Sequence, residues 1–172
     1  YIGSNGSVGA ALDLSGFDLR SVRSLSQACL TMLKARATVF YGLDLSGALL
    51  QAAALERADL RSCLLTGADL RGAALCDAKL NGASLAGAKL RGLQIDGDRQ
   101  LRTDLSGARL RHAVLADADL RGVCFRGADL SFANLSGADL VGADLSGAKL
   151  FSCAVRSEQL DGAASIADAV GL

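Results

Sequence analysis

The sequence predicts an all-β solenoid, and two observations support that prediction. Apolar residues recur at every fifth position over most of the chain, and neither of the common secondary-structure patterns fits this spacing. A five-residue stripe would wind around an α-helix of 3.6 residues per turn, and it would alternate between the two sides of a flat β-strand. The chain must therefore turn once per repeat, so that each apolar side chain points inward.

The repeat extends from residue 40 to residue 160. Its centre is Leu at 45, 50, 55, 60, 65, 70, 75, 80, 85, 90, 105, 110, 115, 120, 130, 135, 140, 145, 150 and 160. The other centres are Phe40, Ile95, Gln100, Phe125 and Val155. Ala is common two residues before the centre, Asp one residue before it, and Gly two residues after it. We expect the small residue to face inward, Gly to ease the corner, and Asp to support the corner through local hydrogen bonds.

Four such repeats close a square coil of about 20 residues, and successive coils stack at the β-sheet spacing of about 4.8 Å. Backbone groups then pair between coils. The motif in Ala68-Asp69-Leu70-Arg71-Gly72 and in Ala138-Asp139-Leu140-Val141-Gly142 resembles the pentapeptide-repeat family, over roughly residues 38–162. The resemblance implies a right-handed quadrilateral β-helix, often capped by a helix and often dimeric.

The register divides the chain into four parts. We expect an N-terminal extension at 1–11, an irregular N-terminal coil or cap at 12–37, the repeat β-helix at 38–162, and a C-terminal cap at 163–172. Within 12–37 we expect one register slip near Val22, with a capping helix at Leu25–Arg36 as the alternative. We expect a bulge or outward loop at 96–103, because Gln100 is not apolar while the frame resumes afterwards. Ser165–Val170 is expected to form a short terminal helix, since an open solenoid end exposes its core and its strand edges.

Composition excludes several classes of protein. The 172 residues contain 18 Lys plus Arg and 18 Asp plus Glu, so the net charge is zero. This balance argues against direct nucleic-acid binding, which needs a basic excess, and equally against a strongly acidic mimic of DNA. Aromatic residues make up 4% and Trp is absent, so the core must be small and aliphatic.

Targeting and redox signals are also weak. No run of about 20 apolar residues predicts a transmembrane segment, and no basic segment before an apolar stretch predicts a signal peptide. The chain begins with Tyr1 rather than Met, so we expect it to be processed, trimmed or part of something longer. The expected compartment is cytoplasmic by default, with the chloroplast or thylakoid lumen as the alternative.

No residue pattern points to catalysis. We assign no catalytic, cofactor-binding or metal-binding residue, and we expect no enzyme and no cofactor. The single histidine, His112, falls at an outward corner without a nearby triad or carboxylate pair. The five cysteines lack metal-ligand spacing, and their odd number argues against a disulfide framework; they are Cys29, Cys63, Cys76, Cys124 and Cys153.

Outward residues predict a partner-binding surface. With 20 residues per coil, Lys89 and Arg109 stack in one column, and Arg71, Arg91 and Arg111 stack in the next column on the same face. This basic patch is interpreted as a docking site for an acidic partner, against the plainer interpretation of a solvated face.

Apolar outward residues extend this surface toward the C-terminus. Phe132 and Phe151 lie further along the same face, one coil apart with their rings stacked, and Val141 lies on the adjacent face. Exposed aromatic residues suggest a contact surface near the C-terminal end, where a homodimer is one arrangement.

Two functions follow from these observations. The first is a non-catalytic protein-interaction or scaffold module, a structural subunit or docking partner within a larger assembly, for which the resemblance suggests a photosynthetic complex as one setting. The second is a DNA-mimicking inhibitor of topoisomerase (gyrase) of the quinolone-resistance type, which the resemblance implies and the zero net charge disfavours. Sequence alone does not name the partner.

Overall fold

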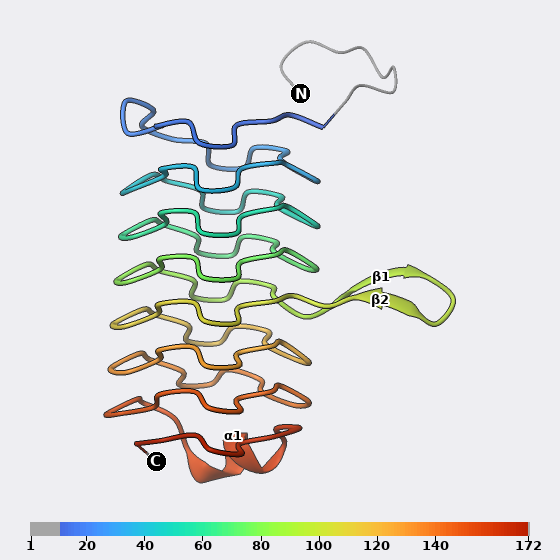
Figure 1. Ribbon diagram of the computed structural model, residues 1–172, viewed down its shortest axis with the longest axis vertical. Helices are drawn as coiled ribbons and strands as arrows, with labels where there is room; N and C mark the ends of the chain where they lie inside the picture. Colours follow the sequence, from blue (N-terminus) through green and yellow to red (C-terminus); the bar gives the residue numbers. More distant parts are fainter. Residues whose placement is uncertain (1–10, 172) are drawn as a thin grey trace.

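A stack of coils forms the molecule (Figure 1). Each regular coil of 20 residues has four sides, because a backbone bridge recurs every five residues. The computed structural model describes residues 11–171, so the expected N-terminal extension at 1–11 lies almost entirely outside the described residues. The architecture is the expected right-handed quadrilateral β-helix. No helix among these residues is long and apolar enough to cross a bilayer.

Backbone hydrogen bonds join each coil to its neighbours. The Leu45 amide donates to the Leu64 carbonyl at 2.7 Å, and the Leu64 amide donates back to the Leu43 carbonyl at 3.1 Å. The pairing is parallel and recurs once per side, as in the bridges Asp44 to Leu64 and Asp59 to Lys79. Because the chain turns after each pairing, these contacts are isolated bridges rather than long strands.

The predicted leucine ladder is the core. Leu80 and its neighbours at five-residue spacing are fully buried, and the small residue two places before each centre is buried beside them. Phe40 and Phe125 are the two aromatic residues in this core. Burying a leucine stabilises a fold by roughly 1.5–3 kcal/mol, so the repeated ladder compensates for the lack of large aromatic core residues.

Each corner is a tight turn with a left-handed residue at its third position. In the turn that begins at Leu45, the Ala48 amide donates to the Leu45 carbonyl at 3.0 Å, and Gly47 has φ 65°. This is the geometry of a type II turn, in which the third residue favours glycine. The turn explains why glycine follows the repeat centre by two residues.

Aspartate before the centre supports these corners as expected. The Ser46 amide donates to the Asp44 carboxylate at 2.9 Å, a local bond that orders the turn. The same bond from the residue two places on is made to Asp13, Asp18, Asp59, Asp69, Asp104, Asp119, Asp129, Asn134, Asp139 and Asp144.

A β-hairpin interrupts the stack where the sequence suggests only a bulge at 96–103. Strand β1 (Leu93–Asp96) pairs antiparallel with β2 (Arg99–Leu101), and the hairpin projects away from the coils (Figure 1). Ala74 pairs with Asp104, 30 residues later instead of 20, so ten residues are inserted. Ile95 is therefore not an inward centre but is 55% exposed. The insertion equals two repeats, so the five-residue frame continues past it and conceals its length.

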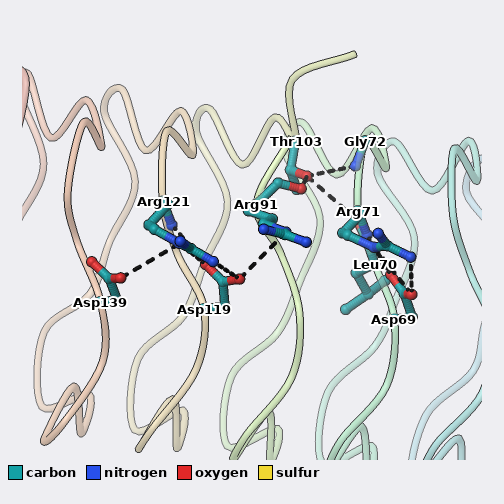
Figure 2. A network of polar contacts seen from close by, with 9 residues as sticks. All are labelled: Asp69, Leu70, Arg71, Gly72, Arg91, Thr103, Asp119, Arg121 and Asp139. Carbon is teal, nitrogen blue, oxygen red and sulfur yellow. Dashed lines mark hydrogen bonds and ion pairs between the residues drawn. The ribbon is translucent and has the colours of Figure 1, made fainter. Parts of the chain in front are cut away.

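Thr103 holds the base of the hairpin. Its buried hydroxyl accepts a hydrogen bond from the Gly72 amide at 2.8 Å and lies 3.2 Å from the Arg91 carbonyl, to which it donates (Figure 2). At other corners this amide meets a carbonyl of the next coil, as when Gly67 donates to Ala86. The threonine thus replaces the backbone contact that the departing chain removes.

The two ends differ from the regular coil. Asp13 and Asp18 pair with residues 21 positions later, whereas Ser24 pairs 20 positions later, so one extra residue lies around Val22. Residues 25–36 continue as coil and do not form the alternative helix.

At the C-terminal end a short helix precedes the last coil. Helix α1 (Ser157–Asp161) lies below the stack, and its Gln159 side-chain amide donates to the Leu135 and Ala138 carbonyls, both at 2.8 Å. The expected helix at Ser165–Val170 is wrong: Ser165 and Val170 pair with Asp144 and Lys149 and complete the final coil. The register slips by one residue between Ala154 and Gly162, where α1 lies, so the final coil falls outside the five-residue frame.

The four faces are numbered here by their inward residues in chain order. They are face 1 (Leu70, Leu90, Leu120, Leu140), face 2 (Leu75, Leu105, Phe125, Leu145), face 3 (Leu80, Leu110, Leu130, Leu150) and face 4 (Leu85, Leu115, Leu135, Val155). Faces 1 and 3 are opposite sides of the square, as are faces 2 and 4.

Candidate interaction surface

The hairpin changes which outward residues share a column. Bridges link Asp69 to Lys89, Lys89 to Asp119 and Asp119 to Asp139, so the step across the hairpin is 30 residues. The predicted column of Arg71, Arg91 and Arg111 is therefore wrong, as is the pairing of Lys89 with Arg109. Arg71, Lys89 and Arg91 lie on face 1, whereas Arg109 and Arg111 lie on face 3, on the opposite side.

On face 1 the basic residues are neutralised by aspartates. Arg71 contacts Asp69 at 2.7 Å, and Arg91 lies 3.6 Å from Asp119 (Figure 2). Arg121 contacts the same Asp119 at 2.8 Å and Asp139 of the next coil at 3.4 Å. The hydrogen bond from Arg121 holds the pKa of Asp119 below its ordinary value. This face is an ion-pair ladder that ties neighbouring coils together, and it is not a free basic patch.

Face 3 collects the exposed aromatic side chains. Tyr41, Phe132 and Phe151 are exposed and lie on this side of the stack, whereas Phe40 and Phe125 are buried. Phe17 is also exposed, but it occupies the inward position two residues before Leu19 in the first coil. Three of the four exposed Phe and Tyr rings of the described residues thus lie on one face. Exposed rings gathered in this way are typical of a contact surface.

The same face carries an excess of positive charge. Its acidic residues Asp18, Asp59 and Asp129 form ion pairs with Arg20, Arg61 and Arg111. The excess therefore consists of three further basic residues, Lys79, Arg109 and Lys149. The zero net charge of the whole chain is therefore not evenly distributed. Basic residues between exposed rings favour a partner that presents carboxylates.

A ring stack forms the C-terminal half of face 3. The rings of His112 and Phe132 lie 5.0 Å apart and nearly parallel, and the Arg111 guanidinium lies 5.2 Å from the centre of the Phe132 ring. Phe132 thus stacks on His112, not on Phe151 as expected, although the Phe132 amide donates to the Phe151 carbonyl of the next coil at 2.8 Å.

Two of these rings occupy strained backbone positions. His112 has φ 59° and Phe132 has φ 61°, at the corner position that favours glycine. Ten other non-glycine residues of the described part have the same corner conformation, so it belongs to the repeat and is not specific to these two rings. Beside this corner Ser131 is fully buried, and its amide donates to the Asp129 carboxylate at 3.1 Å.

A hollow marks the N-terminal half of the same face. It has a volume of about 460 Å³ and is lined by Arg20, Val39, Tyr41, Asp59 and Arg61. The Arg61 guanidinium lies 5.4 Å from the centre of the Tyr41 ring and 2.6 Å from the Asp59 carboxylate, and the latter contact lowers the pKa of Asp59. The hollow therefore combines a ring, two guanidinium groups and one neutralised carboxylate.

Val141 does not belong to this surface. It lies on face 1, in the column of Arg71, Arg91 and Arg121, which is opposite face 3 rather than adjacent to it. Sequence reasoning also missed Tyr41 and Arg61, and it treated His112 as a plain corner residue. A 30-residue step at the hairpin would have brought Tyr41 and Arg61 into line with Arg111 and Phe151, in the column beside His112 and Phe132.

Among the residues that the structure describes, no group of three or more His, Cys, Asp or Glu side chains is arranged to hold a metal ion. Burial raises the pKa of the Cys63 and Cys153 thiols to about 11. These thiols are therefore protonated at neutral pH, which suits packing better than reactivity.

The sequence model of the family described as pentapeptide repeats matches the chain in eight copies, over residues 44–82, 53–92, 102–131 and 124–155. The chain belongs to the pentapeptide-repeat family. Pentapeptide-repeat proteins are generally non-enzymatic structural or interaction proteins. Among curated protein sequences, none matches this pentapeptide-repeat chain.

Several solved structures are similar to this one. A pentapeptide-repeat protein of the Arabidopsis thaliana thylakoid lumen is 28% identical, with 69% of this chain and 72% of that chain covered and a TM-score of 0.36. HetL from the cyanobacterium Nostoc, involved in regulating heterocyst differentiation, is 32% identical, with 93% and 81% covered and a TM-score of 0.28. QnrB1, a plasmid-mediated fluoroquinolone resistance protein, is 19% identical, with 92% and 89% covered and a TM-score of 0.45.

Proposed function

We propose that this pentapeptide-repeat protein is a non-catalytic interaction module that docks a protein partner on face 3. The observation that carries the proposal is the gathering of three exposed rings, Tyr41, Phe132 and Phe151, on that face, together with its excess of basic residues. The corresponding partner surface is acidic at its rim and apolar where it meets the rings.

Energetics support a partner over simple solvation. Full burial of an exposed phenylalanine contributes roughly 1.5–3 kcal/mol, and Phe132 and Phe151 are 45% and 49% exposed, so covering both contributes about as much as burying one ring completely. The surrounding Arg and Lys side chains raise the association rate with an acidic surface. The coil beneath is rigid, because its backbone groups are paired on both sides, so little ordering is needed on binding.

The test is affinity purification from the source organism with matched variants. Phe132→Ser combined with Phe151→Ser is expected to lose the partner. The control, Val141→Ser combined with Ile95→Ser, removes two exposed apolar side chains from face 1 and from the hairpin and is expected to retain it. Recovery of the same proteins by the parent and by the Phe132/Phe151 variant would refute the proposal.

A further inference from the structure

Face 3 has a geometry that narrows the class of its partner. We propose that the partner segment bound on face 3 is an acidic amphipathic α-helix that lies along the axis of the stack. This inference rests on the docking function proposed above. Charge, available backbone groups and spacing each contribute to this proposal.

Backbone pairing on face 3 excludes strand addition. The Leu80 amide donates to the Arg109 carbonyl at 2.7 Å, and the Arg109 amide donates to the Ala78 carbonyl at 2.9 Å. At the following corner the Gly82 amide donates to the Arg111 carbonyl at 2.9 Å. Peptide strands bind by pairing with free backbone groups at a sheet edge, and this face offers such groups only at the two ends of the stack. Its partner must bind through side chains.

The spacing of those side chains matches a helix. Equivalent side chains on face 3 repeat once per coil, at about 4.8 Å. A helix of 1.5 Å rise per residue presents side chains on one face at about 5.4 Å per turn, whereas an extended strand presents them at about 6.8 Å. The side-chain spacing of a helix that lies along the stack therefore stays close to the coil spacing over several turns, whereas the spacing of a strand does not.

The two cationic centres of the face set a register. Arg61 and Arg111 occupy one column with Asn81 between them, so they lie two coils apart, about 10 Å. Residues i and i+7 of a helix share a face and lie about 10.5 Å apart. Carboxylates at i and i+7 therefore reach both guanidinium groups. The column continues to Tyr41 one coil before Arg61 and to Phe151 two coils after Arg111, about 24 Å in all, which corresponds to a helix of about 16 residues.

The arginines have capacity for these carboxylates. Arg61 uses Nε and one terminal nitrogen to hold Asp59, which leaves its other terminal nitrogen for a partner. Arg111 makes an ion pair with Asp129 that is as long as 3.6 Å, while its plane covers the Phe132 ring. The rings of Tyr41 and Phe132 then accept the apolar residues beside the two carboxylates.

Synthetic peptides provide the probe. The first is a helical peptide of about 18 residues with Glu at i and i+7 and Leu beside them on the same face. The second has the same composition with the later Glu moved to i+5, which places it on the other side of the helix. A third probe is a single-stranded oligonucleotide, and fluorescence anisotropy measures the binding of each to the full chain. We expect the first peptide to bind at least about 10-fold more tightly than the other two probes.

Matched variants assign the binding to face 3. Phe132→Gly removes the ring at a corner whose backbone favours glycine, so the thermal midpoint is expected to stay within a few degrees while affinity for the first peptide falls about 10-fold. Met32→Gly is the control: Met32 is also exposed, has φ 58°, and lies at a corner that follows face 1. It is expected to leave the affinity unchanged.

The outcomes separate this proposal from the proposed function. Equal binding of the two peptides, preference for the oligonucleotide, or an equal effect of both glycine variants would overturn the helix proposal. If binding of the natural partner is still lost in the Phe132/Phe151 variant, the docking function holds even though the helix proposal fails. If the natural partner ignores those residues, the docking function itself fails.

Discussion

Individual residues in this fold have roles set by their place in the five-residue repeat. The inward leucines contribute packing, and the aspartates before them order the corners by accepting an amide hydrogen bond, as Asp139 does from Val141 at 3.1 Å. Buried leucine and surface aspartate should therefore differ strongly in their contribution to the free energy of unfolding.

Leu80→Ala is expected to lower the free energy of unfolding by about 2–5 kcal/mol, because it leaves a cavity in a fully buried ladder. Asp139→Ala is expected to cost less than about 1 kcal/mol, since it removes one exposed turn contact and a surface ion pair. Denaturant titration measures both. Comparable losses at the two positions would contradict the inward and outward assignment.

Asp144 should make the fold sensitive to acid. The hydrogen bond from the Ser146 hydroxyl, followed by the Ser146 amide and Arg126, lowers the pKa of this buried carboxyl to about 2. Because the folded pKa lies below the unfolded value of about 3.8, the stabilisation is present above pH 4 and is lost as pH falls toward 2. Asp144→Asn is expected to flatten the fall in stability between pH 4 and 2 in thermal unfolding. An unchanged slope would show that Asp144 is not a major source of the pH dependence.

At the scale of elements, the periodicity predicts the regular coils well and their interruptions poorly. The five-residue leucine pattern identifies the inward side chains. It also predicts the hydrogen bonds by which aspartates such as Asp44 support the corners. The hairpin at β1 and β2 was underestimated because its ten inserted residues equal two repeats and leave the frame intact. That error moved Arg109 and Arg111 to the wrong face in the sequence-based map, while the assignment of Phe132 and Phe151 to the same face as Arg111 needed no step across the hairpin.

The hairpin should be removable without loss of the fold. Deletion of residues 93–102 joins Gly92 to Thr103, which restores the regular spacing from Leu90 to Leu105. We expect the free energy of unfolding of the shortened chain to lie within about 1 kcal/mol of the parent's, because long surface insertions have small effects on stability. Deletion of residues 94–101 leaves two extra residues and is the control, expected to be less stable. Thermal unfolding that ranks the two deletions in the opposite order would contradict the register across the hairpin.

At the scale of the whole molecule, charge is sorted by face even though the chain is neutral. Face 1 alternates Asp69, Lys89 and Asp119 in one column, and face 3 has a basic excess. A protein that imitates DNA must instead repeat negative charge along one side, as the phosphates do. This molecule therefore suits an acidic partner better than a DNA-binding saddle.

We expect no protection of gyrase. In a supercoiling assay, we expect the chain to leave the inhibition of gyrase by a fluoroquinolone unchanged, because neither face 1 nor face 3 presents a continuous acidic column. Rescue of gyrase at low micromolar protein would contradict the charge argument and revive the alternative function.

Hydroxyl-radical footprinting of the chain in its native complex tests docking on face 3 most directly. Aromatic and methionine side chains react readily, and the chain carries such residues on both opposite sides. We expect Tyr41, Phe132 and Phe151 to lose most of their reactivity on assembly, while Met32 on the opposite side retains it. Protection of Met32 with unchanged labelling of Phe132 and Phe151 would contradict docking on face 3.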